Sequence, residues 1–212
     1  MPRMNTDALP LLTAMHLADS AFPTGLFAFS WGLESALAEG QADPRHLTRW
    51  IEAELHGRWH PFDRVALAGG WRLDGAALGD WDALVDASIP AEAQRQQSLQ
   101  AGAALVASAR RMGVALEEGH APVVHGRFLR LSGLDLSAAL AVSAIGMARG
   151  LASAAVRLGR IGAVGIQGEL LRLLPVISPL TQPPDPAELP GGFSPISDIA
   201  LMRPISARLF IN

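Results

Sequence analysis

Apolar residues recur every three or four positions along most of this chain, which is the period of amphipathic helices. Proline, glycine and capping residues separate the periodic segments. Residues 123–131 are short enough to be helix or strand, and helix is favoured because no partner strand is evident. The predicted helices span residues 7–18, 26–38, 43–60, 62–73, 80–89, 90–112, 123–131, 136–158 and 163–176.

Residues 26–38 carry more apolar surface than one helix face requires. Phe27 and Trp31 lie four residues apart on a second face, with Glu34 just beyond them. A surface helix of a single domain needs only one apolar face. The second face is therefore expected to meet another part of the fold or another molecule. The first face is a stripe at helical spacing, formed by Leu26, Phe29, Leu33 and Leu37.

The pattern divides the chain into a helical domain and a C-terminal arm. Residues 136–158 are rich in alanine, serine and glycine, which favours a central helix that its neighbours approach closely. Residues 175–195 contain seven prolines, too many for a helix or a central strand, and predict a linker or an extended arm. The apolar C-terminal end that follows this segment is expected either to pack against the helical domain or to bind a partner. We expect an all-α domain at 1–176, a single compact bundle of about eight to ten helices, followed by a proline-rich linker and partner-binding tail at 177–212.

Composition is consistent with one soluble domain. The chain has 212 residues, of which 50% are hydrophobic and 17% charged, so a sizeable core is expected. The net charge of −3 gives no general reason to bind nucleic acid or acidic membranes. The N-terminus lacks a signal-peptide pattern, and the most membrane-like stretch, residues 136–148, is shorter than the roughly 20 residues of a span. These features predict a cytoplasmic protein.

Missing residue types narrow the possible chemistry. Without cysteine, the chain has no thiolate nucleophile and no cysteine zinc site. All 17 basic residues are arginine, which removes Schiff-base chemistry and the phosphate-loop lysine. The chain has no tyrosine either. An enzyme mechanism would have to use Ser, Thr, His, Asp, Glu or Arg.

Two groups of histidines are candidates for metal binding. His56 and His60 lie four residues apart on a predicted helix, with Asp63 close by, and this spacing can place two imidazoles on one face. A small metal-dependent hydrolase is therefore an alternative function, and surface or packing histidines are the simpler interpretation. His120 and His125 flank a predicted turn near two glutamates, where a transient nickel or zinc site competes with ordinary solvated histidines.

Glycines at every third position from Gly159 to Gly168 match no nucleotide-binding fingerprint and indicate close packing at a turn.

Phe27, Trp31 and Glu34 are the strongest candidates for partner binding, although both aromatic residues could equally belong to the core. A helical module that binds an unrelated protein partner is a further alternative.

Four segments carry a resemblance to a known family. The stretch FPTGLFAFSWGLE, from Phe22 to Glu34, is similar to the opening signature of UreF-type urease accessory proteins. PAEAQRQQSLQAGAAL and SAAVRLGRIGAVGIQGELL resemble two later family segments. In the second of these, Arg157-Leu158-Gly159 and Gln167 fit the pattern, and Ala163 stands where a glutamine is expected. The end of the chain resembles the family's C-terminal segment at Ile199, Met202, Arg208, Leu209 and Phe210.

The resemblance implies a non-catalytic, all-helical homodimer. Such proteins bind a UreD/UreH-type accessory protein, recruit or modulate the UreG-type GTPase, and help deliver nickel to apo-urease. The larger complex handles the nickel, so no cofactor is expected to bind this chain stably. Partner-binding roles are implied for Phe27, Trp31 and Glu34 and for the five C-terminal positions. The tail departs from the family pattern, because Pro204-Ile205 replaces an expected histidine and glutamate and the chain ends in RLFIN.

Overall fold

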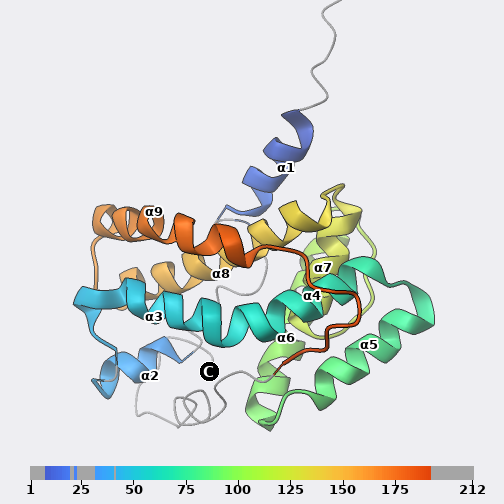
Figure 1. Cartoon of the computed structure of the whole chain (residues 1–212), viewed down its shortest axis with the longest axis horizontal. Helices are drawn as coiled ribbons and strands as arrows, with labels where there is room; N and C mark the ends of the chain where they lie inside the picture. The colour runs from blue at the N-terminus through green and yellow to red at the C-terminus, as the bar shows by residue number, and fades with distance from the viewer. Residues whose placement is uncertain (1–7, 20–21, 23–31, 41, 192–212) are drawn as a thin grey trace, which may run out of the picture.

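The computed structural model describes residues 8–19, 22, 32–40 and 42–191, and every regular element in this part is helical (Figure 1). The all-α prediction is therefore confirmed. The α-helices are accompanied by a 3₁₀ turn, η3, and a π-helical segment, η4. In chain order the elements are α1 (Leu9–Leu17), α2 (Leu33–Ala38), η3 (Pro44–His46), α3 (Leu47–Glu54), η4 (Leu55–Asp63), α4 (Arg64–Arg72), α5 (Gly75–Ala87), α6 (Glu92–Arg111), α7 (Ala121–Leu131), α8 (Leu136–Arg157) and α9 (Ala163–Leu180).

The core is built around α8, as its small residues predicted. Asp135 caps the start of this helix by accepting a hydrogen bond from the Ala138 N–H at 2.8 Å. Leu140 and Leu151 are almost fully buried in the main hydrophobic cluster. The helices and segments packed against α8 are α1, α2, α3, α4, α7, α9 and η4.

Helices α4 and α7 approach each other through glycines. A Cβ atom added to Gly70 would lie 2.2 Å from the carbonyl oxygen of Val123, and one added to Gly126 would lie 2.1 Å from that of Leu67. No side chain fits at either position. The Gly69-Gly70 pair weakens the intrinsic helix propensity of α4, but Gly70, together with Gly126 of α7, allows the two backbones to approach closely.

Helix α5 lies against a second, smaller hydrophobic cluster. Phe62, Ala66 and Val123 face Leu78 and Val85 of α5. Trp81 of the same helix packs on Gly69, where an added Cβ would clash with the indole, and its Nε1–H donates to the Ala66 carbonyl at 3.0 Å. These contacts attach α5 to the side of the bundle (Figure 1).

Proline at position 61 does not end a helix, contrary to the sequence prediction. The helical path continues from α3 through the π-helical segment η4 into α4, and Pro61 lies inside η4. Proline lacks the N–H that an α-helix needs at this position, and the wider π turn accommodates that loss. The result is one long helical path that changes pitch in its middle.

Helix α9 also continues through prolines. It ends at Leu180 and contains Pro175 and Pro179, so the expectation that residues beyond 176 are non-helical is wrong for 177–180. Both prolines are exposed. The carbonyls that lose their donors therefore lie on the solvent side of the helix, where water can bond to them. The domain boundary at 176/177 stays a prediction.

Two of the described helices, α8 and α9, are long and apolar enough to cross a membrane by length and composition alone. Most of α8 is buried inside the bundle, and α9 packs along α8 and α3. The burial of α8 marks it as the core helix of the domain, and its 22 residues extend well beyond the 13-residue apolar stretch noted in the sequence.

Candidate interaction surfaces

Most residues predicted to bind partners lie outside the described part of the chain. These are Phe27, Trp31, Ile199, Met202, Arg208, Leu209 and Phe210. Glu34 is described, and it is only 7% exposed within α2, whose residues 33–37 are all buried. Phe22, which opens the signature segment, is also buried and stacks on Phe128 of α7 at a centroid distance of 5.7 Å. Roles in partner binding stay predictions.

The structure does not gather His56, His60 and Asp63 into a metal site. His56 is exposed, whereas His60 is partly buried. Burial, followed by the charge of Arg64, lowers the pKa of His60. The Asp63 carboxylate is already engaged, because its Oδ2 atom lies 3.2 Å from Arg58 Nε. Among the described residues, no group of three or more His, Asp or Glu side chains is arranged to hold a metal ion.

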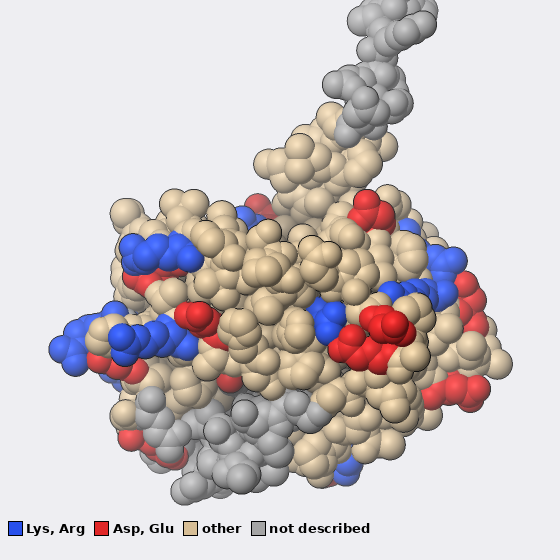
Figure 2. Space-filling model, viewed as in Figure 1, with Lys and Arg blue, Asp and Glu red and all other residues tan. Residues whose placement is uncertain are grey.

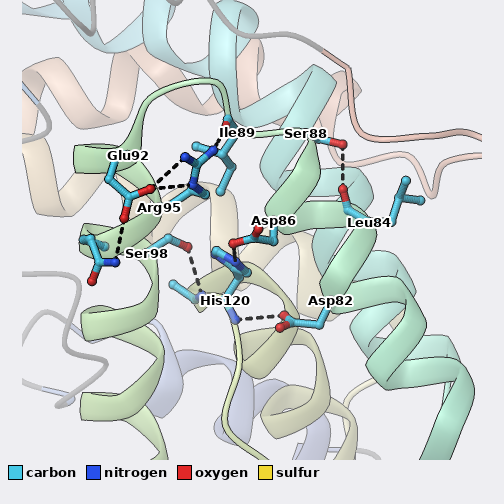
Figure 3. A network of polar contacts seen from close by, with 11 residues as sticks. Asp82, Leu84, Asp86, Ser88, Ile89, Glu92, Arg95, Ser98 and His120 are labelled. Carbon is cyan, nitrogen blue, oxygen red and sulfur yellow. Dashed lines mark hydrogen bonds and ion pairs between the residues drawn. The ribbon is translucent and has the colours of Figure 1, made fainter.

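His120 is buried, and with the next residue it links three helices (Figure 3). Its backbone N–H donates to Asp82 Oδ1 at 2.8 Å, and its Nε2 atom lies 3.1 Å from Asp86 Oδ1. Both aspartates belong to α5, so His120 is bonded to that helix twice. The next residue, Ala121, donates its N–H to Ser98 Oγ of α6 at 3.2 Å. His120 is only 1% exposed, and together with Ala121 it joins α5 and α6 to the start of α7.

His125 lies inside α7 and is buried. Burial lowers its pKa to about 4, so the imidazole is neutral near pH 7. The sequence interpretation of His120 and His125 as solvated loop residues is therefore wrong. Their turn-like surroundings, with Pro122 between them, hid the fact that α7 begins at Ala121 and packs closely on α4.

The described surface carries an unusual apolar element in α1. This helix has no charged Asp, Glu, Lys or Arg side chain, and Figure 2 shows it standing out from the body without a charged residue. It is tied to the core at its C-terminal end, where Leu17 is buried and the Arg149 guanidinium donates to the Ala18 carbonyl. Four large apolar side chains are each at least 58% exposed: Leu9, Leu11, Leu12 and Met15.

Helix α9 presents a second apolar surface. Val164 is 90% exposed, Leu171 67% and Leu174 45%. These positions are seven and three residues apart, a spacing that aligns them on one face of the helix. The opposite face of α9, with Ile166, Leu170 and Leu173, is buried in the core. Helix α9 is therefore apolar on two sides, and only one of them is covered.

Sequence comparisons identify the family. A family model described as UreF matches residues 41–174. The urease accessory protein UreF of Cereibacter sphaeroides (strain ATCC 17029 / ATH 2.4.9) is 34% identical over 200 residues, which cover 91% of this chain and 93% of that protein. The chain belongs to the UreF family.

Other UreF proteins match over similar lengths. Urease accessory protein UreF of Trichodesmium erythraeum is 29% identical over 99% of this chain and its own full length. That of Paracoccus denitrificans is 32% identical over 84% of this chain and 82% of its own. As a member of the UreF family, the chain is a non-catalytic accessory protein. The metal-dependent hydrolase and the module unrelated to urease are therefore both wrong.

Proposed function

We propose that this chain acts as a homodimeric scaffold in the cytoplasm during assembly of the urease nickel centre. It binds a UreD/UreH-type accessory protein, recruits or modulates a UreG-type GTPase, and brings both to apo-urease. Nickel passes through the larger complex, and the chain holds no cofactor stably. Family membership and the large exposed apolar faces of α1 and α9 support this role.

The exposed apolar side chains of α1 and α9 are the main structural support for this proposal. A monomeric soluble protein rarely leaves several large aliphatic side chains exposed on neighbouring turns, and such surfaces commonly mark protein–protein contacts. A scaffold needs contacts of this kind, whereas a catalyst needs a cluster of reactive side chains. The exposed leucines of α1 and α9 fit the first requirement.

Copurification tests the proposal. The full chain and a chain truncated before Ser194 are each expressed with the UreD/UreH-type protein and the GTPase, with and without nickel. The full chain is expected to retain both partners, and the truncated chain to lose the UreD/UreH-type protein because it lacks residues 196–210. Undiminished binding by the truncated chain would refute the assigned role of the tail. Failure of the full chain to retain either partner would refute the scaffold role.

A further inference from the structure

The proline-rich residues after α9 are held on the body by arginines of α4. Beyond Leu180, residues 181–191, which we call the strap, turn back across α4 (Figure 1). Arg64 Nη1 donates to the Gln182 carbonyl oxygen at 3.0 Å. Arg72 Nη2 donates to the Pro184 carbonyl oxygen at 2.6 Å. The first half of the strap is thus bonded to α4 through its backbone.

A turn brings the second half of the strap back to the same arginine. Asp185 Oδ1 accepts a hydrogen bond from the Ala187 N–H at 2.8 Å, and the Asp185 carbonyl accepts one from the Glu188 N–H at 2.9 Å. The reversal places Glu188 Oε1 2.6 Å from Arg64 Nη2. One guanidinium group therefore binds both limbs of the folded strap.

The burial of Arg64 makes this contact energetically important. Its side chain is only 6% exposed, and its third bond runs from Nε to the His60 carbonyl at 2.9 Å. Two of these three acceptors belong to the strap. A buried cation that loses its acceptors is strongly destabilising. Detachment of the strap is therefore opposed by the charge that it would leave behind.

The composition of the strap suits an arginine-bearing face. Pro183, Pro184 and Pro186 have no backbone N–H, so the segment offers carbonyl acceptors with few donors in need of partners. Arginine has donors only, fixed in a planar fork. The proline density that reads as a loose linker in the sequence therefore complements Arg64 and Arg72.

The strap also determines where the chain leaves the described body. Gly191 donates its N–H to the Pro61 carbonyl at 2.8 Å, and a Cβ added to Gly191 would lie 3.2 Å from that oxygen. Pro61 lies in η4, one residue after His60, whose carbonyl accepts from Arg64. The described part of the chain therefore ends beside η4 and not at the end of α9.

We propose that Arg64 is a positioning residue for the C-terminal end of the chain. By holding the strap, it fixes the point from which residues 192–212 begin, and Arg72 supports it. This inference rests on the proposed function, in which those residues bind the UreD/UreH-type protein. A segment that starts from a fixed point loses less freedom on binding and meets its partner at a higher effective concentration.

The test combines partner affinity with hydrogen exchange in the strap. Arg64→Gln is expected to speed amide exchange in residues 181–191 and to weaken binding of the purified UreD/UreH-type protein at least tenfold. Arg64→Lys should behave similarly, because a single ammonium group cannot reproduce the three-way fork. Arg111→Gln, at an exposed arginine ending α6, is the matched control and should change neither measurement.

Two outcomes separate this inference from the proposed function. If a chain ending at Gly191 fails to bind while Arg64→Gln binds like the wild type, the positioning role is refuted and the role of the tail stands. If the chain ending at Gly191 binds like the full chain, the tail has no binding role and the positioning role is refuted with it.

A second variant covers the case in which Arg64→Gln does not fold. Glu188→Ala removes the strap's own side-chain contact at a position that is 37% exposed. Faster exchange in the strap together with weaker binding would support the inference. Wild-type affinity despite faster exchange would overturn it.

Discussion

Single glycines decide how closely α4 and α7 pack. Gly126 faces the backbone of Leu67, and Gly70 faces the backbone of Val123 across the same interface. A backbone carbonyl cannot rotate away as the end of a flexible side chain can. At this scale the presence of a Cβ atom sets the distance between two core helices.

Gly126→Ala is expected to destabilise the protein despite the better helix propensity of alanine. The added methyl group would lie 2.1 Å from the Leu67 carbonyl oxygen, so the helices must move apart, at a cost of about 1–3 kcal/mol or more. Urea unfolding measures the change. Gly146→Ala in α8 is the control, because a Cβ there meets nothing within 4 Å; it should be neutral or stabilising by up to about 1 kcal/mol. Equal effects of the two substitutions would contradict the packing explanation.

Histidines at the residue scale show how local sequence can mislead. His120 and His125 flank Pro122, and such a segment resembles a solvated turn. Burial depends on residues far away in the chain: Asp82 and Asp86 hold His120 from α5, and α4 covers α7. No local pattern records these partners.

At the scale of elements, proline has two effects that its local rules do not anticipate. Pro61 lies within a continuous helical path, and Pro175 and Pro179 lie within α9. In the proline-rich strap, the Gln182 and Pro184 carbonyls accept hydrogen bonds from Arg64 and Arg72, which precede them by more than 100 residues. Proline excludes some backbone conformations. Contacts with neighbouring elements then determine which of the allowed conformations the segment adopts.

Removal of the strap should therefore destabilise the helical body. A chain ending at Leu180 leaves Arg64 without Gln182 and Glu188, whereas a chain ending at Gly191 keeps both. The shorter chain is expected to lose on the order of 3 kcal/mol of unfolding free energy relative to the longer one. Thermal or urea unfolding of the two chains tests this. Equal unfolding free energies of the two chains would mean that the contacts of the strap with Arg64 do not stabilise the body.

At the scale of the whole molecule, the most distinctive feature is the projecting helix α1. It has no Asp, Glu, Lys or Arg side chain and is mostly apolar, and helices of such composition are normally buried. Its exposed leucines and those of α9 give the body two apolar faces that no described helix covers. A second copy of the chain, as in the proposed homodimer, would cover such surface.

The proposed homodimer predicts a mass near twice the chain mass of 22.4 kDa in light scattering at micromolar concentration. Leu12→Asp places a charge on the exposed face of α1, where Leu12 is 58% exposed, and should shift the mass toward that of one chain. Leu131→Asp, at a 48% exposed position ending α7, is the control and should leave the dimer intact. A wild-type mass of one chain would refute the homodimer.

The periodicity of apolar residues determined the helical class, most helix positions and the central place of residues 136–158, because 3.6-residue spacing and small side chains are local properties. The signature residues also indicated the family by themselves. Which surfaces stay uncovered, which histidines are buried and whether the proline-rich segment is free or docked were decided only by the tertiary structure. Each of these depends on partners distant in sequence, such as Arg64 and Glu188, which are 124 positions apart, and the packing of the helices alone brings such residues together.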